Sequence, residues 1–291
     1  DAGGQILEDL TSRGINLVAN AAAQSADHIG SYFTMLRAEL GFYVSCLNLA
    51  DRLAAKGVPV TTPQPTQPST LPFSCAALRD TCLELQSQDP VVGNDVQADG
   101  KSLVIITGAN RGGKTTFLRS VGLAQLMMQC GLFVTAEAFA SSVHSGLFTH
   151  FKRQEDRRME SGKFDEELVR MSAIADRLRP DGMMLFNESF AATHELEGSE
   201  IARQIVSALR ERGVTVFFVT HMYEFARSFL QDPAVRFLRA DRAEDGSRSF
   251  RLHEAEPLSK SFGIDLYRRI FEDGAQQEPV AGAAASSAVL D

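Results

Sequence analysis

The sequence lacks the features of membrane and secreted proteins. No apolar run approaches the ~18 residues of a membrane span, and no signal peptide opens the chain. The four cysteines stand at positions 46, 75, 82 and 130, with no CxxC pair and no zinc spacing among them. These absences argue against a membrane-spanning protein and predict free thiols in a reducing compartment.

An excess of basic residues is also missing. The chain has 29 Lys and Arg against 37 Asp and Glu, for a net charge of −8. Because phosphate binding depends largely on Lys and Arg, this balance argues against a protein whose whole surface coats DNA or anionic lipid. It leaves room for a local basic patch.

The apolar content is high enough for a sizeable core. Hydrophobic residues make up 44% of the 291 positions. At about 100–200 residues per domain, this length allows one large domain, or one domain with an appendage. A peptide, a fibrous repeat and a mainly disordered protein are thereby excluded. The chain starts at Asp1 without a Met, so we expect a fragment of a longer protein.

The N-terminal part is typical of one long helix. Residues 15–56 contain no proline, and apolar side chains recur at steps of three and four from Ile29 to Leu47. The pattern ends at Lys56-Gly57, just before Pro59. We therefore expect a helical segment over residues 1–58. Five of the ten prolines follow in residues 59–72, which predicts a linker there.

Residues 73–275 have the pattern of an α/β domain. Short apolar runs at 103–107, 183–186 and 214–220 alternate with amphipathic stretches ending at Cys130, near 165–179 and near 197–212. Such alternation predicts a mainly parallel sheet with helices on both faces. The last residues, 276–291, are poor in bulky apolar groups, and we expect a disordered tail.

A glycine-rich motif carries the strongest chemical signal. Residues 108–115, GANRGGKT, fit the pattern GxxxxGK[ST] directly between a predicted strand and a predicted helix. In such a loop backbone N–H groups surround the phosphates, Lys114 faces the β- and γ-phosphates, and the Thr115 hydroxyl binds Mg²⁺. A glycine-rich turn that binds nothing is the weaker interpretation, because both flanking elements are present. The sequence predicts a P-loop fold that binds ATP or ADP with Mg²⁺. The predicted contacts are Gly108, Ala109, Asn110, Arg111, Gly112, Gly113, Lys114, Thr115 and Thr116.

Two further strand ends supply candidate catalytic residues. Glu188 follows a strand where a general base for water would lie, and Asn187 stands where an aspartate is usual. An amide oxygen still accepts a hydrogen bond from a magnesium-bound water, but the lost charge predicts weaker metal binding or slow turnover. His221 ends the next strand and would contact the γ-phosphate or the attacking water. A purely structural histidine is the alternative there.

The order of these motifs resembles the ATPase domain of the MutS family of DNA mismatch repair proteins. The similarity lies in TGANRGGKTTFLRSVGLAQLM, FNESFAATHELEG and VTHMYEF, with weaker likeness in Asp89–Asp95 and Ser259–Ile264. It spans about residues 89–270, and the predicted helix over 1–58 resembles the lever helices that connect the family's ATPase to its DNA clamp, which implies a lever or connector there. The resemblance implies a homodimer in which each nucleotide lies between the phosphate loop of one subunit and a signature segment of the other. It also implies coupling to DNA through upstream domains and a cytoplasmic, nucleoid-associated location.

Several positions depart from that family's pattern. The acidic pair is Asn187-Glu188 instead of Asp-Glu, and Phe190 and Ala192 replace the glycines that follow it. The signature Ser-Thr-Phe appears as Gly162-Lys163-Phe164, so only Ser161 or Lys163 would reach a partner's γ-phosphate. These departures indicate a divergent MutS-like branch.

We conclude from the sequence that this is an Mg²⁺-dependent MutS-like ATPase. The alternative is a nucleotide-gated dimerisation module that hardly hydrolyses ATP, which Asn187 and the missing signature hydroxyl favour. An ABC-type protein or a small-molecule kinase fits less well, because no LSGGQ-like segment is present. Residues 150–163 intersperse acids and bases, so a solvated loop is favoured over a DNA-facing one. The role of Arg111 stays open.

Overall fold

The computed structural model describes residues 2–67, 71–152, 162–240 and 248–258. The chain divides into two compact units, residues 1–60 and 61–291, which we call the N-terminal and C-terminal units. The predicted tail at 276–291, the Ser259–Ile264 stretch and most of the loop at 150–163 lie outside the described residues.

The N-terminal unit consists of one helix, α1, Ala2–Ala55. Its length confirms the helix predicted from the proline-free pattern, and it begins earlier than that pattern indicated. Hydroxyl groups are accommodated inside the helix, since Thr11 and Thr34 donate to the carbonyls of Leu7 and Gly30, four residues back. Gly57 follows the helix at φ +69°, a left-handed conformation that suits the C-terminal end of a helix.

A six-stranded sheet forms the centre of the C-terminal unit. Its strands run in the order β10-β9-β4-β8-β7-β6, and all neighbours are parallel except β10 and β9. This confirms a mixed α/β fold with a mainly parallel sheet. The strand bounds are β4 Leu103–Gly108, β6 Leu147–Phe151, β7 Met183–Asn187, β8 Thr215–Val219, β9 Val235–Ala240 and β10 Leu252–Glu254.

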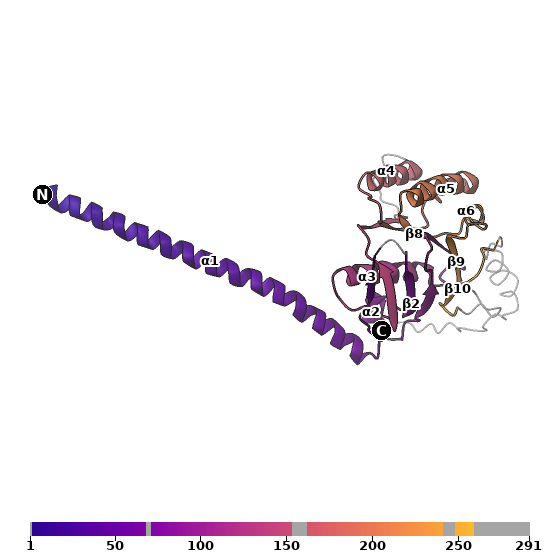
Figure 1. Cartoon of the computed structure of the whole chain (residues 1–291), viewed down its shortest axis with the longest axis horizontal. Coiled ribbons are helices and arrows are strands. Elements are labelled where there is room, and N and C mark those ends of the chain that lie inside the picture. The colour runs from indigo at the N-terminus through magenta and orange to yellow at the C-terminus, as the bar shows by residue number, and fades with distance from the viewer. Residues whose placement is uncertain (1, 68–70, 153–161, 241–247, 259–291) are drawn as a thin grey trace, which may run out of the picture. The chain divides into compact units, whose positions relative to one another are not determined.

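Helices cover both faces of this sheet because its central strands are apolar on both sides. In β4, Val104 and Ile106 pack against α3, Lys114–Gln129, whereas Leu103 and Ile105 belong to a second core cluster. That second cluster includes residues of α4 (Lys163–Ala175), α5 (Glu195–Glu211) and α6 (Tyr223–Arg227). Figure 1 shows α4, α5 and α6 together on one side, and α2 and α3 on the other. The three predicted helices of this region are confirmed.

A second sheet was not predicted. It has the strand order β1-β5-β2-β3 and contributes Phe73, Val96 and Phe139 to the core on the α3 side. Its bounds are β1 Gln64–Thr66, β2 Phe73–Leu78, β3 Asn94–Gln97 and β5 Ala138–Ser142, with α2 at Thr81–Gln86.

Strand β1 lies inside the segment that we expected to be a linker. It pairs in parallel with β5, with Gln64 opposite Ala140 and Thr66 opposite Ser142. An edge strand tolerates Pro65 because one side of it needs no ladder hydrogen bond. At residues 64–66 the structure therefore differs from the expected linker.

All four cysteines are free thiols, and burial raises the pKa of Cys75 to about 12. No helix in the part of the chain that the structure describes combines the length and apolar character needed to cross a bilayer.

Candidate functional site

The glycine-rich loop turns from β4 into α3 at the carboxyl edge of the sheet. Gly108 has φ +107°, and a Cβ built on it would lie 2.2 Å from the carbonyl oxygen of Ala240 in β9. Gly113, the N-cap of α3, has φ +91°, and no side chain caps this helix. The loop therefore requires glycine at Gly108, and it leaves the first N–H groups of α3 available to a ligand.

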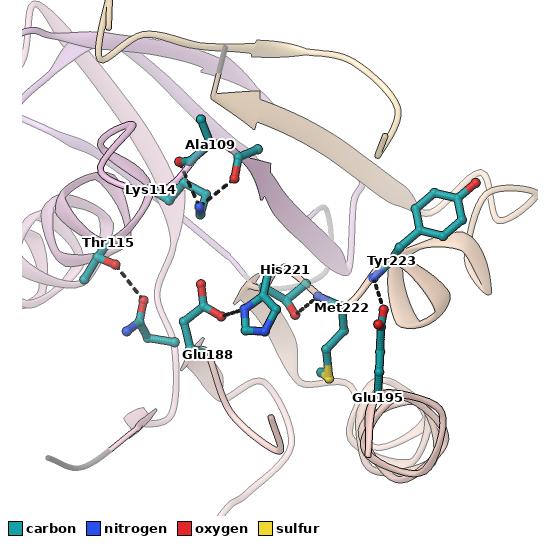
Figure 2. A network of polar contacts seen from close by, with 11 residues as sticks. Ala109, Lys114, Thr115, Glu188, Glu195, His221, Met222 and Tyr223 are labelled. Carbon is teal, nitrogen blue, oxygen red and sulfur yellow. Dashed lines mark hydrogen bonds and ion pairs between the residues drawn. The ribbon is translucent and has the colours of Figure 1, made fainter. Parts of the chain in front are cut away.

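Lys114 is buried and turned back onto the loop. Its Nζ donates to the carbonyl oxygens of Gly108, at 2.7 Å, and Ala109, at 3.0 Å (Figure 2). Burial lowers the pKa of Lys114, and the charge of Glu188 opposes that shift. The buried positive charge of Lys114 is stabilised mainly by carbonyl dipoles. Its ammonium can therefore give up these hydrogen bonds for stronger ones to an anion.

Asn187 lies at the end of β7, directly beside the start of α3. The hydroxyl of Thr115 donates to its Oδ1 over 2.9 Å, as Figure 2 shows. The side-chain amide of Asn187 is therefore oriented with its oxygen facing Thr115. These two oxygens form a neutral polar pair next to the loop.

Residues 188–190, which we call the acidic turn, follow directly. Glu188 has φ +53°, and its N–H donates to the carbonyl of Val219 at the end of β8, over 2.9 Å. Nδ1 of His221 donates to the Glu188 carboxylate (Figure 2). That hydrogen bond, outweighing the opposing effect of burial, raises the pKa of His221. The strand ends thus bring Glu188 and His221 together as a hydrogen-bonded pair.

A cavity of about 480 Å³ opens between the loop and the second sheet. This volume is in the range of small-molecule sites. One wall is polar and contains Asn110–Thr116 and Glu188. The opposite wall is mainly apolar, and its residues come from the end of β2, from α2, from the segment after α2 and from the segment before β10. The apolar residues of this wall are Leu78, Leu83, Pro90, Val91, Val92 and Phe250.

Asn94 fixes the part of this wall that precedes β10. Its Nδ2 donates to the carbonyl of Phe250 at 3.3 Å, and its Oδ1 accepts from the N–H of Leu252 at 2.7 Å. Sequence reasoning placed Asn94 near the site but missed Phe250 and Leu83. No local pattern marks those two residues, because they reach the cavity only through the tertiary fold.

The structure brings most of the predicted site residues together. Residues 110–116 and Glu188 line the cavity, Gly108 and Ala109 hold Lys114, and Asn187 and His221 contact lining residues. Arg111 lines it too, at φ +59°.

The predicted signature segment, residues 161–163, is not among the described residues that line the cavity. Ser161 lies outside the described residues, Gly162 caps α4, and Lys163 opens that helix. Among the described residues that line the cavity, none comes from α4.

The structure is that of a mixed α/β protein with a cavity at the carboxyl edge of a mainly parallel sheet, next to a helix N-terminus. The family described as MutS domain V matches residues 104–272, which is more than half of the chain. The chain belongs to the MutS family. The family described as the MutS2 N-terminal domain matches residues 1–56.

Curated relatives agree with this assignment. DNA mismatch repair protein MutS of Chloroflexus aurantiacus is 27% identical over 268 residues, which is 90% of this chain and 28% of that protein. The Thermus aquaticus protein of the same name is 31% identical over 177 residues, 60% of this chain and 22% of the relative. The Porphyromonas gingivalis protein is 31% identical over 193 residues, 64% and 22%. The chain thus spans about a quarter of the length of these relatives.

Proposed function

We propose that the C-terminal unit is a P-loop ATPase that binds ATP with Mg²⁺ and hydrolyses it. One observation carries the proposal: an uncapped helix N-terminus, the buried ammonium of Lys114 and the carboxylate of Glu188 all lie around one cavity. A triphosphate needs backbone N–H donors, a cation and a residue that handles the attacking water. This arrangement supplies each of them.

The triphosphate would lie along the glycine-rich loop. Its oxygens would accept from the N–H groups at the start of α3, and Lys114 would leave the carbonyls of Gly108 and Ala109 for the β- and γ-phosphates. The nucleobase would then contact the apolar wall that includes Val92 and Phe250. Burial of Lys114 strengthens its attraction for phosphate, because little water screens it.

The oxygen donors present suit Mg²⁺. Thr115 and Asn187 place a hydroxyl and an amide oxygen 2.9 Å apart beside the loop, and magnesium prefers hard oxygen ligands. No group of three or more His, Cys, Asp or Glu side chains forms a metal site among the described residues, so phosphates and water would complete the shell. The bound ion would neutralise charge on the phosphates during transfer.

Glu188 would act on the attacking water. The water oxygen bonds to the γ-phosphorus, the bond to the β–γ bridging oxygen breaks, and the water proton passes to the Glu188 carboxylate, giving ADP and phosphate. His221 would orient Glu188 through the hydrogen bond seen here and contact the γ-phosphate. The missing charge at Asn187 predicts slow turnover.

The relatives are DNA mismatch repair proteins, which supports a role of the longer protein in DNA repair. We propose that it is a homodimer with composite nucleotide sites, grips DNA outside this chain and works in the cytoplasm at the nucleoid. The signature segment, Ser161, Gly162 and Lys163, would act on the nucleotide of a partner subunit, as the family resemblance implies. Charge is consistent with this division, since this chain carries −8.

The test combines ATP affinity and steady-state phosphate release, with Mg²⁺, for the wild type and Lys114→Ala. We expect the variant to lose at least ~100-fold in affinity, because a buried charge-assisted contact to phosphate disappears. Lys101→Ala is the control, since that ammonium donates to Pro233 outside the cavity. Unchanged affinity in Lys114→Ala would refute the assignment. Tight binding without phosphate release would indicate the nucleotide-gated dimerisation module instead.

A further inference from the structure

The acidic turn has a backbone conformation that its residues do not favour. Glu188 and Phe190 have φ values of +53° and +63°, in the left-handed region that suits glycine. Such conformations persist only where the surrounding structure holds them. The contacts of this turn therefore identify what positions the Glu188 carboxylate.

Phe190 makes most of the contacts that fix the conformation of this turn. Its N–H donates to Oε2 of Glu167 in α4 over 2.9 Å. Its ring is fully buried and stacks on the imidazole of His150, with ring centres 5.2 Å apart and planes at 14°. Its carbonyl lies so close to α5 that a Cβ on Gly198 would be 2.3 Å from the oxygen. Both peptide groups of Phe190 are therefore fixed by neighbouring helices.

The hydrogen bonds of His150 define its tautomer. The single proton of the Ser189 hydroxyl goes to the carbonyl of His150, at 2.7 Å, so Nδ1 of His150 must donate to Ser189 Oγ, also at 2.7 Å. Nε2 is then an acceptor and takes an N–H of Arg170 at 3.0 Å, and its 3.2 Å approach to the carbonyl oxygen of Glu167 is a contact without a hydrogen bond. Burial and the Arg170 charge lower the pKa of His150 to about 4, so the ring is neutral.

Arg170 joins this group to the sheet. Its guanidinium also donates to the carbonyl of Phe151, the last residue of β6, over 2.8 Å. Glu167 and Arg170 stand three residues apart on α4, so one face of this helix holds both the turn and the strand beside it. We call the buried residues His150, Glu167 and Ser189, together with half-buried Arg170, the buried polar cluster.

We propose that Glu167 is a positioning residue, which acts through the N–H of Phe190 and with the rest of the buried polar cluster to hold Glu188 toward the nucleotide cavity. The position of α4 thereby sets the rate of hydrolysis. This inference rests on the ATPase function proposed above. It assigns Glu167 an acceptor role, for which the negative charge is dispensable. Burial raises the pKa of this carboxyl, which agrees with a role that does not depend on ionisation.

The experiment separates binding from turnover in the full-length protein. ATP affinity is measured by calorimetry and phosphate release at saturating ATP, for the wild type, Glu167→Ala and Glu167→Gln. We expect Glu167→Ala to release phosphate at least ~10-fold more slowly with ATP affinity within ~2-fold of wild type, because only the acceptor for Phe190 is lost. Glu167→Gln keeps a carbonyl acceptor and should stay within ~3-fold of the wild-type rate.

Asp165→Ala is the matched control, because it removes an exposed carboxylate from the same helix, and it should leave both quantities unchanged. Ser189→Ala provides a second route, since it releases the His150 ring while keeping the Glu167–Phe190 bond. Thermal melting shows which variants are folded. If Glu167→Ala does not fold, Ser189→Ala alone decides, and a rate below ~one third of wild type at unchanged affinity supports the proposal.

Three results overturn the inference. The first is a wild-type rate of phosphate release in folded Glu167→Ala, or in Ser189→Ala where that variant alone decides. The second is a loss of ATP affinity that parallels the loss of rate. The third is a Glu167→Gln variant as slow as Glu167→Ala. A wild-type protein that binds ATP and releases no phosphate overturns the ATPase proposal and this one together. An active wild type with an unaffected Glu167→Ala overturns only the positioning role.

Discussion

The glycine-rich loop and the acidic turn face the same cavity and both use positive φ, but they reach it by different means. The loop has glycine at two of its three positive-φ positions, Gly108 and Gly113, whose backbones adopt these angles without strain, and Arg111 at the third. The turn uses Glu188 and Phe190, and contacts from α4 and α5 hold Phe190. The conformation of the proposed phosphate-binding loop therefore depends mainly on its own short sequence, whereas the position of the proposed catalytic base depends on tertiary packing.

The largest effect should come from adding one methyl group to the loop. In Gly108→Ala the new Cβ would lie 2.2 Å from Ala240 O at φ +107°, so we expect a loss of about 3 kcal/mol in the free energy of unfolding and no ATP binding. Gly131→Ala is the control, because its φ is +73° and nothing lies within 4 Å. It should cost about 1 kcal/mol. Denaturant unfolding compares the two, and equal losses would show that the Ala240 contact is irrelevant.

The corresponding change at the acidic turn is Gly198→Ala. Its Cβ would lie 2.3 Å from the Phe190 carbonyl oxygen, so α5 and the turn must separate. We expect a loss of about 2 kcal/mol in stability, because the helix can shift slightly. Phosphate release should fall while ATP affinity stays unchanged, whereas the loop variant Gly108→Ala should lose ATP binding itself. Loss of affinity in folded Gly198→Ala would remove the distinction between the two regions.

Part of this comparison could be predicted from the sequence and part could not. The strands ending at Gly108, Asn187 and Val219 were identifiable from short apolar runs, and the loop motif from spacing alone. Parallel strands then bring their carboxyl ends to one edge, so the meeting of Thr115 with Asn187 followed.

The rest depends on contacts between residues distant in sequence. Strand β1 lies in a proline-rich segment, which does not have the pattern of a strand. Phe250 lines the cavity together with Gly113, although the two are 137 residues apart in the sequence. The buried polar cluster joins three elements, and its members have no shared spacing. Phe190 stood out in the sequence only as a replacement for a family glycine, and the contact from Glu167 that holds it joins residues distant in the chain.

A third prediction concerns the metal side of the cavity. Asn187→Asp restores one negative charge beside Thr115, so half-maximal phosphate release should need less Mg²⁺ and the rate should rise about 10-fold. Asn110→Asp adds the same charge at another lining position and should bring no such gain. A titration with Mg²⁺ at fixed ATP measures both. An unchanged Mg²⁺ requirement in Asn187→Asp would exclude residue 187 from the metal shell.

The smallest effect concerns pH. The pKa of His221 is raised above its ordinary value, chiefly because it donates a hydrogen bond to Glu188. The protonated ring is therefore favoured by folding, so its stabilisation is fully present below the unfolded pKa and lost as the pH rises through the higher folded pKa. The imidazole side chain is 58% exposed, so screening keeps the effect small. His221→Asn should lower Tm more in acidic than in alkaline buffer, and equal deficits would contradict this.

The most direct test of the central claim is a crystal structure of the full-length Glu188→Gln protein with Mg²⁺ and ATP. The account predicts a triphosphate wrapped by residues 108–115, with Nζ of Lys114 moved from the carbonyls of Gly108 and Ala109 to the phosphate oxygens. A cavity that holds no nucleotide at saturating ATP, or a nucleotide bound elsewhere with Lys114 still on those carbonyls, would contradict it.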